Sequence, residues 1–368
     1  MVTMLHIVEV LTPYGGVPVK LLRLAKQIDP ERGRLVFSVF QPAALDDVIT
    51  QVGSHVRQIG SVSPVRIVRE LDRAIEEERP DVVCSHHTRG LITGFIAAKR
   101  HGLPLIHHEH SSAHYRQGIG RLVAQTIMPR VDRVICNSLY TLRSIQAAYP
   151  GIGGKLCHVH DPVVERPSAT TAQAVRQELG LSQTDLVIGH IGGFIPERDQ
   201  GTLIRAVDQL RRSYHHVKLV LVGDGPERAR LEALVQTLHL GALVRFTGYR
   251  DPGDLLGVMD LYVNPCVDEG FGIAVVEAML AGLPVVIANA GSHPELIVDG
   301  YTGFLYQPGD PEKLAVQLRW LIDNPAEARH MGERARIHAQ RNFSPNRFLT
   351  GYLDAMQPFV ERLDPITR

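Results

Sequence analysis

The chain has 368 residues, and its 39 basic and 39 acidic residues give a formal net charge of zero at pH 7. This balance gives no electrostatic case for nucleic-acid binding, while a hydrophobic fraction of 44% is sufficient for well-formed cores. At the usual size of about 150 residues per domain, the length predicts two domains.

The first half of the chain alternates strand-like and helix-like segments. It begins with a short apolar strand and lacks the basic leader of a signal peptide. Strands are expected at residues 5–10, 35–40, 82–85, 104–110, 133–138 and 156–160. Helices are expected at residues 19–28, 65–78, 91–101, 121–128 and 140–148. Such alternation predicts a parallel sheet that is covered by helices on both faces.

The second half repeats this pattern after a break at residues 161–171, which are rich in Pro, Ser and Thr and are interpreted as a linker. Strands are expected at residues 186–191, 218–222, 244–247, 261–264, 285–288 and 303–306, and the last helices at 311–323, 326–341 and 345–363. We therefore predict an α/β protein with two Rossmann-like parallel-sheet domains, 1–165 and 166–344. Ligands of such sheets bind outside the carboxyl ends of the strands.

Cysteine content and hydropathy limit the possible location of the protein. Cys84, Cys136, Cys157 and Cys266 are scattered and form no C-x-x-C pair. This predicts a reduced, intracellular protein without a zinc ribbon or a disulfide framework. No apolar run approaches the ~18 residues of a membrane-spanning helix. We expect a cytoplasmic protein that is at most peripheral to the inner face of the membrane.

Two glutamates separated by seven residues, Glu269 and Glu277, form the most specific candidate site. They follow an apolar strand and enter a predicted helix at residues 272–281. Gly270 and Gly272 leave the backbone bare at the turn, where N–H groups and the positive helix end favour an anion. A ligand with a phosphate between two hydroxyl-bearing groups, such as a nucleoside diphosphate sugar, fits this layout. The alternative is an amphipathic helix with solvated acids.

Histidines cluster where the strand at residues 104–110 ends. Strand alternation places His108 and His110 on one face and Glu109 on the other. A zinc site is the alternative interpretation, and its further ligands would be His86, His87 and His114. Spacing along one strand does not supply a tetrahedral ligand set. We therefore expect no metal.

The segment 265–279 resembles the E-x7-E signature of the retaining nucleotide-sugar glycosyltransferases of family 4. Glu-Gly-Phe-Gly follows the apolar strand, Glu-Ala-Met comes next, and Gly-Leu-Pro-Val-Val follows at residues 282–286. The resemblance implies the GT-B architecture, in which two Rossmann-like domains face each other across a cleft. It also implies that residues 345–368 rejoin the N-terminal, acceptor-binding domain and that the C-terminal domain binds the donor.

The resemblance assigns roles to individual residues. It implies that Glu277 binds the ribose hydroxyls and that Glu269 holds sugar hydroxyls. His110 matches the family histidine whose side chain or carbonyl lies near the transferred sugar. Tyr249 belongs to a stretch whose backbone meets the nucleobase in the family. The catalytic residues implied in this way are His110, Glu269 and Arg198.

The loop at residues 192–199 departs from the family pattern. The family has an Arg and a Lys there that clamp the donor diphosphate, whereas this chain has Gly193 and Arg198. Arg198 can still pair with phosphate, but Gly193 supplies no charge. The donor-binding residues that the resemblance implies, including the N-terminal glycine pair, are Gly15, Gly16, Gly193, Arg198, Tyr249, Glu269, Gly270, Phe271, Gly272 and Glu277.

The resemblance implies a retaining, metal-independent glycosyltransferase without a cofactor. It would move a hexose-type sugar from a nucleoside diphosphate donor to a hydroxyl acceptor, in polysaccharide or glycoconjugate biosynthesis. One alternative is a catalytically weak or inactive sugar-nucleotide-binding subunit, and another is a GT-B enzyme such as a sugar-nucleotide epimerase. A dehydrogenase is disfavoured because no G-x-G-x-x-G opens either half.

The acceptor is expected to be a saccharide or a lipid-linked saccharide, which many members of the resembled family extend at the membrane face. An apolar stretch at residues 122–128 has Arg116, Arg121, Arg130 and Arg133 around it. A basic amphipathic segment of this kind can lie on anionic lipid. The alternative is a core helix with solvated Arg at its ends.

Overall fold

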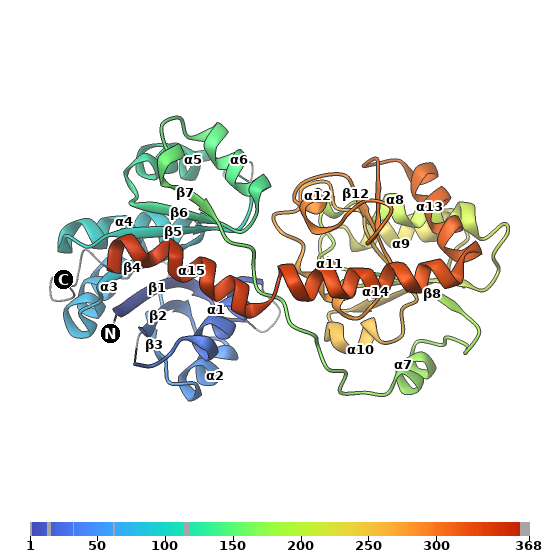
Figure 1. Ribbon diagram of the computed structural model, residues 1–368, viewed down its shortest axis with the longest axis horizontal. Helices are drawn as coiled ribbons and strands as arrows, with labels where there is room; N and C mark the ends of the chain where they lie inside the picture. The colour runs from blue at the N-terminus through green and yellow to red at the C-terminus, as the bar shows by residue number, and fades with distance from the viewer. Residues whose placement is uncertain (1, 13–15, 32, 62, 113–117, 361–368) are drawn as a thin grey trace. The chain divides into compact units, whose positions relative to one another are not determined.

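The computed structural model describes residues 2–12, 16–31, 33–61, 63–112 and 118–360 (Figure 1). The chain divides into two compact units. Unit 1 comprises Met1–Pro162 and Pro345–Arg368, and unit 2 comprises Val163–Ser344. The division falls slightly before the expected boundary at 165/166. Each unit contains one sheet made of parallel strands, so the predicted pair of Rossmann-like domains is confirmed.

Unit 1 contains a seven-stranded sheet in the order β3-β2-β1-β4-β5-β6-β7. Its strands are β1 (Val2–Val10), β2 (Gly33–Gln41), β3 (His55–Gln58), β4 (Val82–His86), β5 (Leu105–Glu109), β6 (Arg133–Cys136) and β7 (Leu156–His158). Its helices include α1 (Gly16–Gln27), α2 (Leu45–Gln51), α3 (Pro64–Glu78), α4 (His87–His101), α5 (Gly118–Ile127), α6 (Leu139–Ala148) and α15 (Pro345–Val360). The strand order reverses between β1 and β4, which is the switch point where doubly wound sheets bind ligands.

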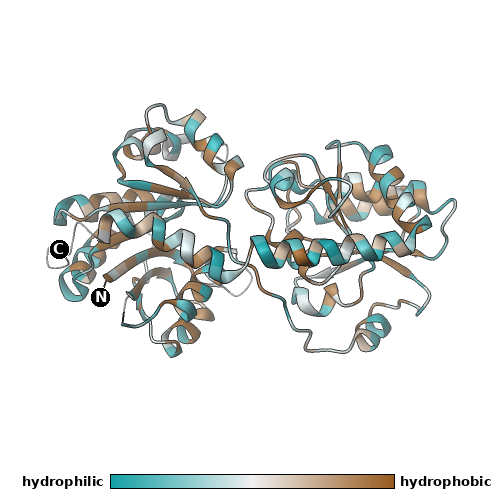
Figure 2. Ribbon diagram, in the orientation of Figure 1, coloured by the Kyte–Doolittle hydropathy of each residue, from teal (hydrophilic) through white to brown (hydrophobic). Residues whose placement is uncertain are grey.

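The residues of β1 show why its segment forms a central strand. Leu5 and Ile7 are buried in one hydrophobic cluster, and Met4 and Val8 are buried in another. Alternate side chains of a strand point to opposite faces of the sheet, so β1 contributes to both cores. Hydrophobic and hydrophilic residues also alternate along the helices (Figure 2). The final helix α15 packs in the second of these clusters, together with Met4 and Val8.

Unit 2 contains a six-stranded sheet in the order β10-β9-β8-β11-β12-β13. Its strands are β8 (Leu186–Ile191), β9 (Val217–Val222), β10 (Val244–Gly248), β11 (Leu261–Asn264), β12 (Val285–Ala288) and β13 (Phe304–Tyr306). Its α-helices are α7 (Ala172–Glu178), α8 (Gln200–Leu210), α9 (Arg228–Thr237), α10 (Pro252–Leu256), α11 (Ile273–Leu280), α12 (His293–Leu296), α13 (Pro311–Asp323) and α14 (Pro325–Asn342). A short 3₁₀ helix, η4 (Pro196–Arg198), follows β8.

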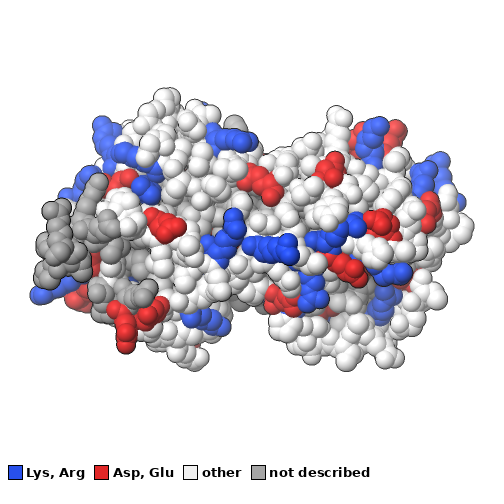
Figure 3. Space-filling model, viewed as in Figure 1, with Lys and Arg blue, Asp and Glu red and all other residues white. Residues whose placement is uncertain are grey.

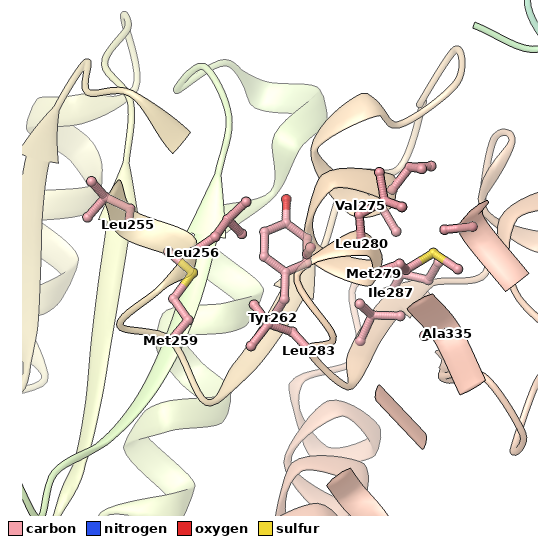
Figure 4. Close-up of a cluster of buried hydrophobic side chains, with 14 of the residues drawn as sticks. Leu255, Leu256, Met259, Tyr262, Val275, Met279, Leu280, Leu283, Ile287 and Ala335 are labelled. Atoms are coloured by element: carbon pink, nitrogen blue, oxygen red, sulfur yellow. The ribbon is translucent and has the colours of Figure 1, made fainter. Parts of the chain in front are cut away.

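The helix α11 is anchored in the core of unit 2 (Figure 4). Val275 and Met279 on α11 are fully buried in the cluster that contains Tyr262 of β11 and Ile287 of β12. Burying one such aliphatic side chain stabilises the fold by roughly 1.5–3 kcal/mol. The backbone of α11 is therefore held firmly, and so are the polar residues that it carries.

Several details of unit 1 differ from the sequence expectations. The patterns do not predict α2, which has only seven residues, or β3, whose sequence His-Val-Arg-Gln lacks apolar alternation. The expected strand 104–110 ends at Glu109, so His110 lies in the loop that follows. The expected strand 133–138 ends at Cys136, because Ser138 accepts a hydrogen bond from the Thr141 amide and begins α6.

Candidate functional site

The turn between β11 and α11 has a backbone that other parts of unit 2 hold closely. Gly272 precedes the helix with φ of 94°, in the left-handed region that favours glycine, and a Cβ there would lie 2.9 Å from Leu296 Cδ1. The Ser292 amide donates to the Glu269 carbonyl at 3.0 Å, and the Ser292 hydroxyl donates to the Phe271 carbonyl at 2.9 Å. The turn that carries Glu269, Gly270 and Phe271 is therefore built to one shape.

Glu269 is buried beside a cation. Its carboxylate accepts a hydrogen bond from Arg198 Nη1 and lies 3.5 Å from Asn264 Nδ2. Burial opposes ionisation of Glu269, but the charges of Arg198 and His293 and the hydrogen bonds from Arg198 and Asn264 outweigh it and lower the pKa of this carboxyl. Glu269 is therefore an anion at neutral pH. Because η4 follows β8, Arg198 and Glu269 meet at the carboxyl edge of the sheet.

His293 was not predicted as part of this site. It is fully buried, and its Nδ1 lies 2.8 Å from the Ala288 carbonyl oxygen. Burial lowers the pKa of His293, although the charge of Glu269 and the hydrogen bond to the Ala288 carbonyl act to raise it. Its approach to Glu269 depends on the tertiary fold, because 24 positions separate the two residues in the chain.

Glu277 lies in the second turn of α11 and is almost completely buried. Arg166 donates to it, with Nε 2.6 Å from Glu277 Oε1. Arg166 lies between β7 and α7, and its Nη1 is also 3.8 Å from Asp251 Oδ2. Sequence patterns did not indicate Arg166, because 111 positions separate it from Glu277 and it stands in an expected linker.

Gly193 lies in a loop that has room for a side chain. A Cβ at this position would meet only the Asp224 carbonyl oxygen, at 3.9 Å. Gln200 Nε2 donates to the Gly193 carbonyl at 3.0 Å and so holds the loop. The Tyr249 hydroxyl donates to the same Asp224 carbonyl at 3.1 Å, while most of the Tyr249 side chain is exposed. Gly193 and Tyr249 are thus brought to the same edge of the sheet in unit 2.

In unit 1, His110 is held through both of its ring nitrogens. Nε2 lies 3.0 Å from His86 Nδ1, and Nδ1 lies 3.5 Å from Lys20 Nζ. Asn137 Nδ2 donates to the His110 carbonyl at 3.1 Å. Burial, assisted by the charge of Lys20 and by neighbouring histidines, holds the pKa of His110 well below its ordinary value. The ring is therefore neutral at pH 7.

The other N-terminal candidates are placed as follows. Gly16 is the first residue of α1, whereas Gly15 and His114 lie outside the described residues. His108 and His110 have stacked rings on one side of the sheet, and Glu109 lies 3.5 Å from His107 on the other, as alternation predicts. Across the described ranges, no three His, Cys, Asp or Glu side chains are arranged to hold a metal ion.

The apolar stretch of α5 is used mainly for packing. Ala124 and Ile127 of α5, and Met128 of the 3₁₀ turn that follows it, are buried in a core cluster of unit 1, whereas Leu122 is exposed. Arg133 lies over the Phe359 ring, 5.5 Å from its centroid; Arg116 lies outside the described residues. On the face shown in Figure 3, basic and acidic side chains both occur over each unit. None of the helices in the described part of the chain combines the length and apolarity that crossing a bilayer requires.

Comparison with known proteins adds independent information. A family model described as "Glycosyl transferases group 1" matches residues 172–338, and one described as "Glycosyltransferase Family 4" matches residues 14–164. D-inositol 3-phosphate glycosyltransferase of Streptomyces avermitilis is 32% identical over 286 residues, which cover 71% of this chain and 61% of that protein. N-acetyl-alpha-D-glucosaminyl L-malate synthase of Bacillus anthracis is 32% identical over 179 residues, or 48% of this chain and 47% of that protein. The chain thus spans less than two thirds of the length of these relatives.

Solved structures show the same fold over almost the whole chain. Anabaena HepE in complex with UDP and glucose matches with a TM-score of 0.84 and 25% identity, covering 97% of this chain and 100% of that one. Sucrose-phosphate synthase from Thermosynechococcus elongatus matches with a TM-score of 0.84 and 18% identity, covering 98% and 100%. The second likeness concerns the fold alone. These matches confirm the expected GT-B fold class.

Proposed function

Because the chain belongs to glycosyltransferase family 4, we propose that it transfers a hexose-type sugar from a nucleoside diphosphate sugar to a hydroxyl acceptor. The observation that carries this proposal is the pair of buried carboxylates, Glu269 and Glu277, that flank the start of α11 at the carboxyl edge of the unit 2 sheet. Sheets of this type bind nucleotides at that edge. HepE, which has the same fold, binds UDP-glucose.

The two glutamates have different surroundings, and this supports different roles. Glu277 is fixed by Arg166 on a helix that is anchored in the core, so it suits the ribose hydroxyls of the donor. Glu269 lies beside Arg198, which suits a sugar hydroxyl next to a phosphate. Carboxylates accept strong hydrogen bonds from hydroxyl groups. Tyr249 is exposed at the same edge, where a nucleobase can contact it.

We propose that the leaving diphosphate is stabilised without a metal ion. Arg198 supplies one positive charge, and the N–H groups around Gly272 at the start of α11 supply further donors. No side chain of the site is set apart as an enzymic nucleophile, since Glu269 is engaged by Arg198. Attack by the acceptor on the same face that the diphosphate leaves would give retention of configuration.

The acceptor is proposed to be a saccharide, a lipid-linked saccharide or a small hydroxyl compound. The names of two relatives contain D-inositol 3-phosphate and L-malate, so anionic hydroxyl compounds belong in the acceptor panel. If the acceptor is a lipid-linked saccharide, the proposal includes contact with a membrane. The burial of Ala124, Ile127 and Met128 favours the core-helix interpretation of α5, and hence an acceptor in solution.

Turnover with a donor panel tests the proposal. UDP-glucose and GDP-mannose are incubated with the protein and with acceptors that include D-inositol 3-phosphate and L-malate, and release of UDP or GDP is measured. We expect one donor to be consumed, with a glycosylated product of unchanged anomeric configuration by NMR. Donor binding in calorimetry without turnover would support an inactive binding subunit instead. Conversion of the donor to an epimer would support an epimerase.

A further inference from the structure

A continuous series of buried and partly buried hydrogen bonds runs through unit 1 and includes His110. Its members come from separate elements and, in order, are Lys20, His110, His86, His6 and Tyr352. The contacts are Lys20 Nζ to His110 Nδ1 at 3.5 Å, His110 Nε2 to His86 Nδ1 at 3.0 Å, His86 Nε2 to His6 Nδ1 at 3.1 Å, and His6 Nε2 to Tyr352 Oη at 3.4 Å. We call this series the imidazole chain.

The proton positions along the imidazole chain follow from its first member. Lys20 Nζ forms an ion pair with Asp161 at 2.8 Å, and an ammonium group can only donate hydrogen bonds. His110 Nδ1 must therefore accept, which places the His110 proton on Nε2. That proton is donated to His86 Nδ1, so His86 in turn carries its proton on Nε2.

The same logic extends to the far end. His86 donates to His6 Nδ1, and His6 then donates from Nε2 to the Tyr352 hydroxyl. The Tyr352 hydroxyl donates onward to Met4 Sδ, which lies at 3.7 Å. Every donor in the imidazole chain thus has an acceptor. In the opposite direction, an N–H of His110 would point at the Lys20 ammonium group, and two donors would face each other.

The imidazole chain requires neutral rings, because a protonated ring has two donors and no acceptor. Burial, followed by the charge of Lys20, lowers the pKa of His6 to about 3. Burial likewise holds the pKa of His86 and of His110 well below the ordinary value. The rings are therefore neutral at pH 7, as the hydrogen-bond directions require.

Ring stacking restricts the orientation of the same residues. The centroids of His86 and His110 are 5.3 Å apart with planes only 11° from parallel, and those of His86 and His108 are 4.6 Å apart. His108 also stacks on Tyr352 at 5.7 Å. Neither ring nitrogen of His108 has a hydrogen-bond partner among the described residues, so His108 contributes packing and takes no part in the imidazole chain itself.

We propose that Lys20, His86, His6 and Tyr352 are positioning residues that hold His110 in its Nε2-protonated tautomer and in one ring orientation for sugar transfer. This inference rests on the proposed function, in which His110 lies near the transferred sugar. With Nδ1 accepting from Lys20 and Nε2 donating to His86, the ring is held in place, and the His110 carbonyl, which keeps a second lone pair beside the one that accepts from Asn137 Nδ2, is the atom that accepts from a sugar hydroxyl. The Nε2 proton is committed to His86, so the His110 ring does not serve as a general acid.

The tautomer is measured directly by NMR on protein labelled with ¹⁵N-histidine at pH 7.5. Long-range proton–nitrogen spectra separate protonated from unprotonated ring nitrogens, and the His110→Gln spectrum identifies the His110 signals. We expect a protonated Nε2 and an unprotonated Nδ1 at His110. A protonated Nδ1 overturns the proposal, whether or not the protein shows transferase activity.

Two substitutions at His86 separate positioning from packing. His86→Leu removes both hydrogen bonds, and we expect His110 to become a mixture of tautomers. His86→Gln can accept through Oε1 and donate through Nε2, so it should restore the single tautomer. Turnover is measured with whichever of UDP-glucose and GDP-mannose is the donor. We expect kcat to fall about tenfold in His86→Leu, the usual effect of removing a residue that only orients a site residue. The donor KM should change much less.

Cys84→Ala is the matched control, because the buried Cys84 thiol is only a weak hydrogen-bond partner of the Tyr352 hydroxyl, at 4.0 Å, and its loss leaves that hydroxyl its acceptor at Met4 Sδ. We expect it to keep the His110 tautomer and kcat.

If His86→Leu does not fold, Tyr352→Phe is used, which removes a single hydroxyl from the end of the imidazole chain and should shift the His6 Nε2 signal. A folded His86→Leu protein with an unchanged His110 tautomer overturns the proposal. Absence of turnover in the wild type with both donors contradicts the proposed function, while the spectra still decide the imidazole chain.

Discussion

Arg166 Nε lies 2.6 Å from Glu277 Oε1, and this contact joins the segment before α7 to the helix that carries the second glutamate of the site. The Glu277 side chain is 3% exposed and that of Arg166 is 22% exposed. A carboxylate buried to this degree requires a partner. Arg166 therefore keeps Glu277 in one orientation.

Replacement of Glu277 is expected to abolish tight donor binding and to leave the fold intact. Glu277→Ala removes the two charge-assisted hydrogen bonds that we propose to the ribose, which should cost about 3 kcal/mol or more, or roughly a hundredfold in Kd. Calorimetric titration with the donor measures the loss, and Glu312→Ala on the exposed first turn of α13 is the control. Unchanged affinity in Glu277→Ala would exclude the ribose assignment.

Arg166→Gln tests whether the ion pair supports the same function. We expect a smaller loss of donor affinity, about 1 kcal/mol, because Glu277 keeps its charge but loses a hydrogen bond that orients it. The double variant should lose no more than Glu277→Ala alone, since the two residues act through one contact. Calorimetry on all four proteins gives the coupling, and additive losses would show that Arg166 acts elsewhere.

Gly193→Arg is expected to fold and to bind the donor at least as tightly as the wild type. A Cβ at Gly193 has space, since its nearest contact is the Asp224 carbonyl oxygen at 3.9 Å, and an Arg there restores the second cation of the family pattern. Gly272→Ala is the opposite control, because φ is 94° and the new Cβ would lie 2.9 Å from Leu296. Thermal unfolding and donor titration measure both variants. Loss of donor binding in a folded Gly193→Arg protein would show that this loop does not face the diphosphate.

Chelation is expected to leave activity unchanged. The proposed mechanism stabilises the diphosphate through Arg198 and the N–H groups at the start of α11. Turnover is measured before and after dialysis against EDTA, with Arg198→Gln as the variant that should lose activity in both conditions. Activity that disappears on chelation and returns with Zn²⁺ or Mn²⁺ would contradict the metal-independent mechanism.

The sequence predicted the parallel sheets because buried strands such as β11 and β12 are continuous apolar runs with glycine and proline at their ends. The turn before α11 was recognisable because Gly270 and Gly272 are local features of the chain. The residues that contact the site residues were not recognisable in this way. Arg166 reaches Glu277, and His86 reaches His110, only after the fold brings distant segments together, and no local pattern records those contacts. Two members of the imidazole chain, His86 and His110, were therefore candidate zinc ligands in the sequence.

The protein is expected to remain in solution when mixed with anionic vesicles at low salt. The apolar side of α5 is used in the core, through Ala124 and Ile127. Leu122 is exposed, but a single exposed apolar side chain is ordinary for a soluble surface. Co-sedimentation with vesicles at low and high salt tests this. Salt-sensitive binding that Leu122→Glu abolishes would restore the peripheral membrane role and favour a lipid-linked acceptor.

The stability of the protein is expected to fall steeply between pH 6.5 and 5.5. Burial lowers the pKa of several histidines in unit 1 below the ordinary value of 6.5; they are His6, His86, His87, His108 and His110. Lys20 and His107 oppose their protonation further, whereas Glu9 and Glu109 partly favour it at His87. These residues stay neutral in the folded state but bind protons once unfolded. Their stabilising contribution is therefore complete above pH 6.5 and is lost as the pH falls below it.

Below pH 6.5, each such histidine should remove about 1.4 kcal/mol per pH unit from the free energy of unfolding. The summed loss from several histidines is large compared with the free energy of unfolding of a typical domain, which is roughly 5–15 kcal/mol. Guanidinium unfolding at pH 7.5, 6.5 and 5.5 measures the change, and hydrogen exchange should show that unit 1 opens first.

His108→Leu is the sharpest test of this pH dependence. His108 is buried, and neither of its ring nitrogens has a hydrogen-bond partner among the described residues. Burying such groups costs about 1–3 kcal/mol, so leucine should not destabilise the protein at pH 7.5. The free energy of unfolding of the variant, relative to the wild type, should be about 1.4 kcal/mol higher at pH 5.5 than at pH 7.5. The reason is that the unfolded variant has one proton-binding group fewer. An identical pH dependence in wild type and His108→Leu would mean that His108 is protonated in the folded state, and that burial does not keep this group of rings neutral.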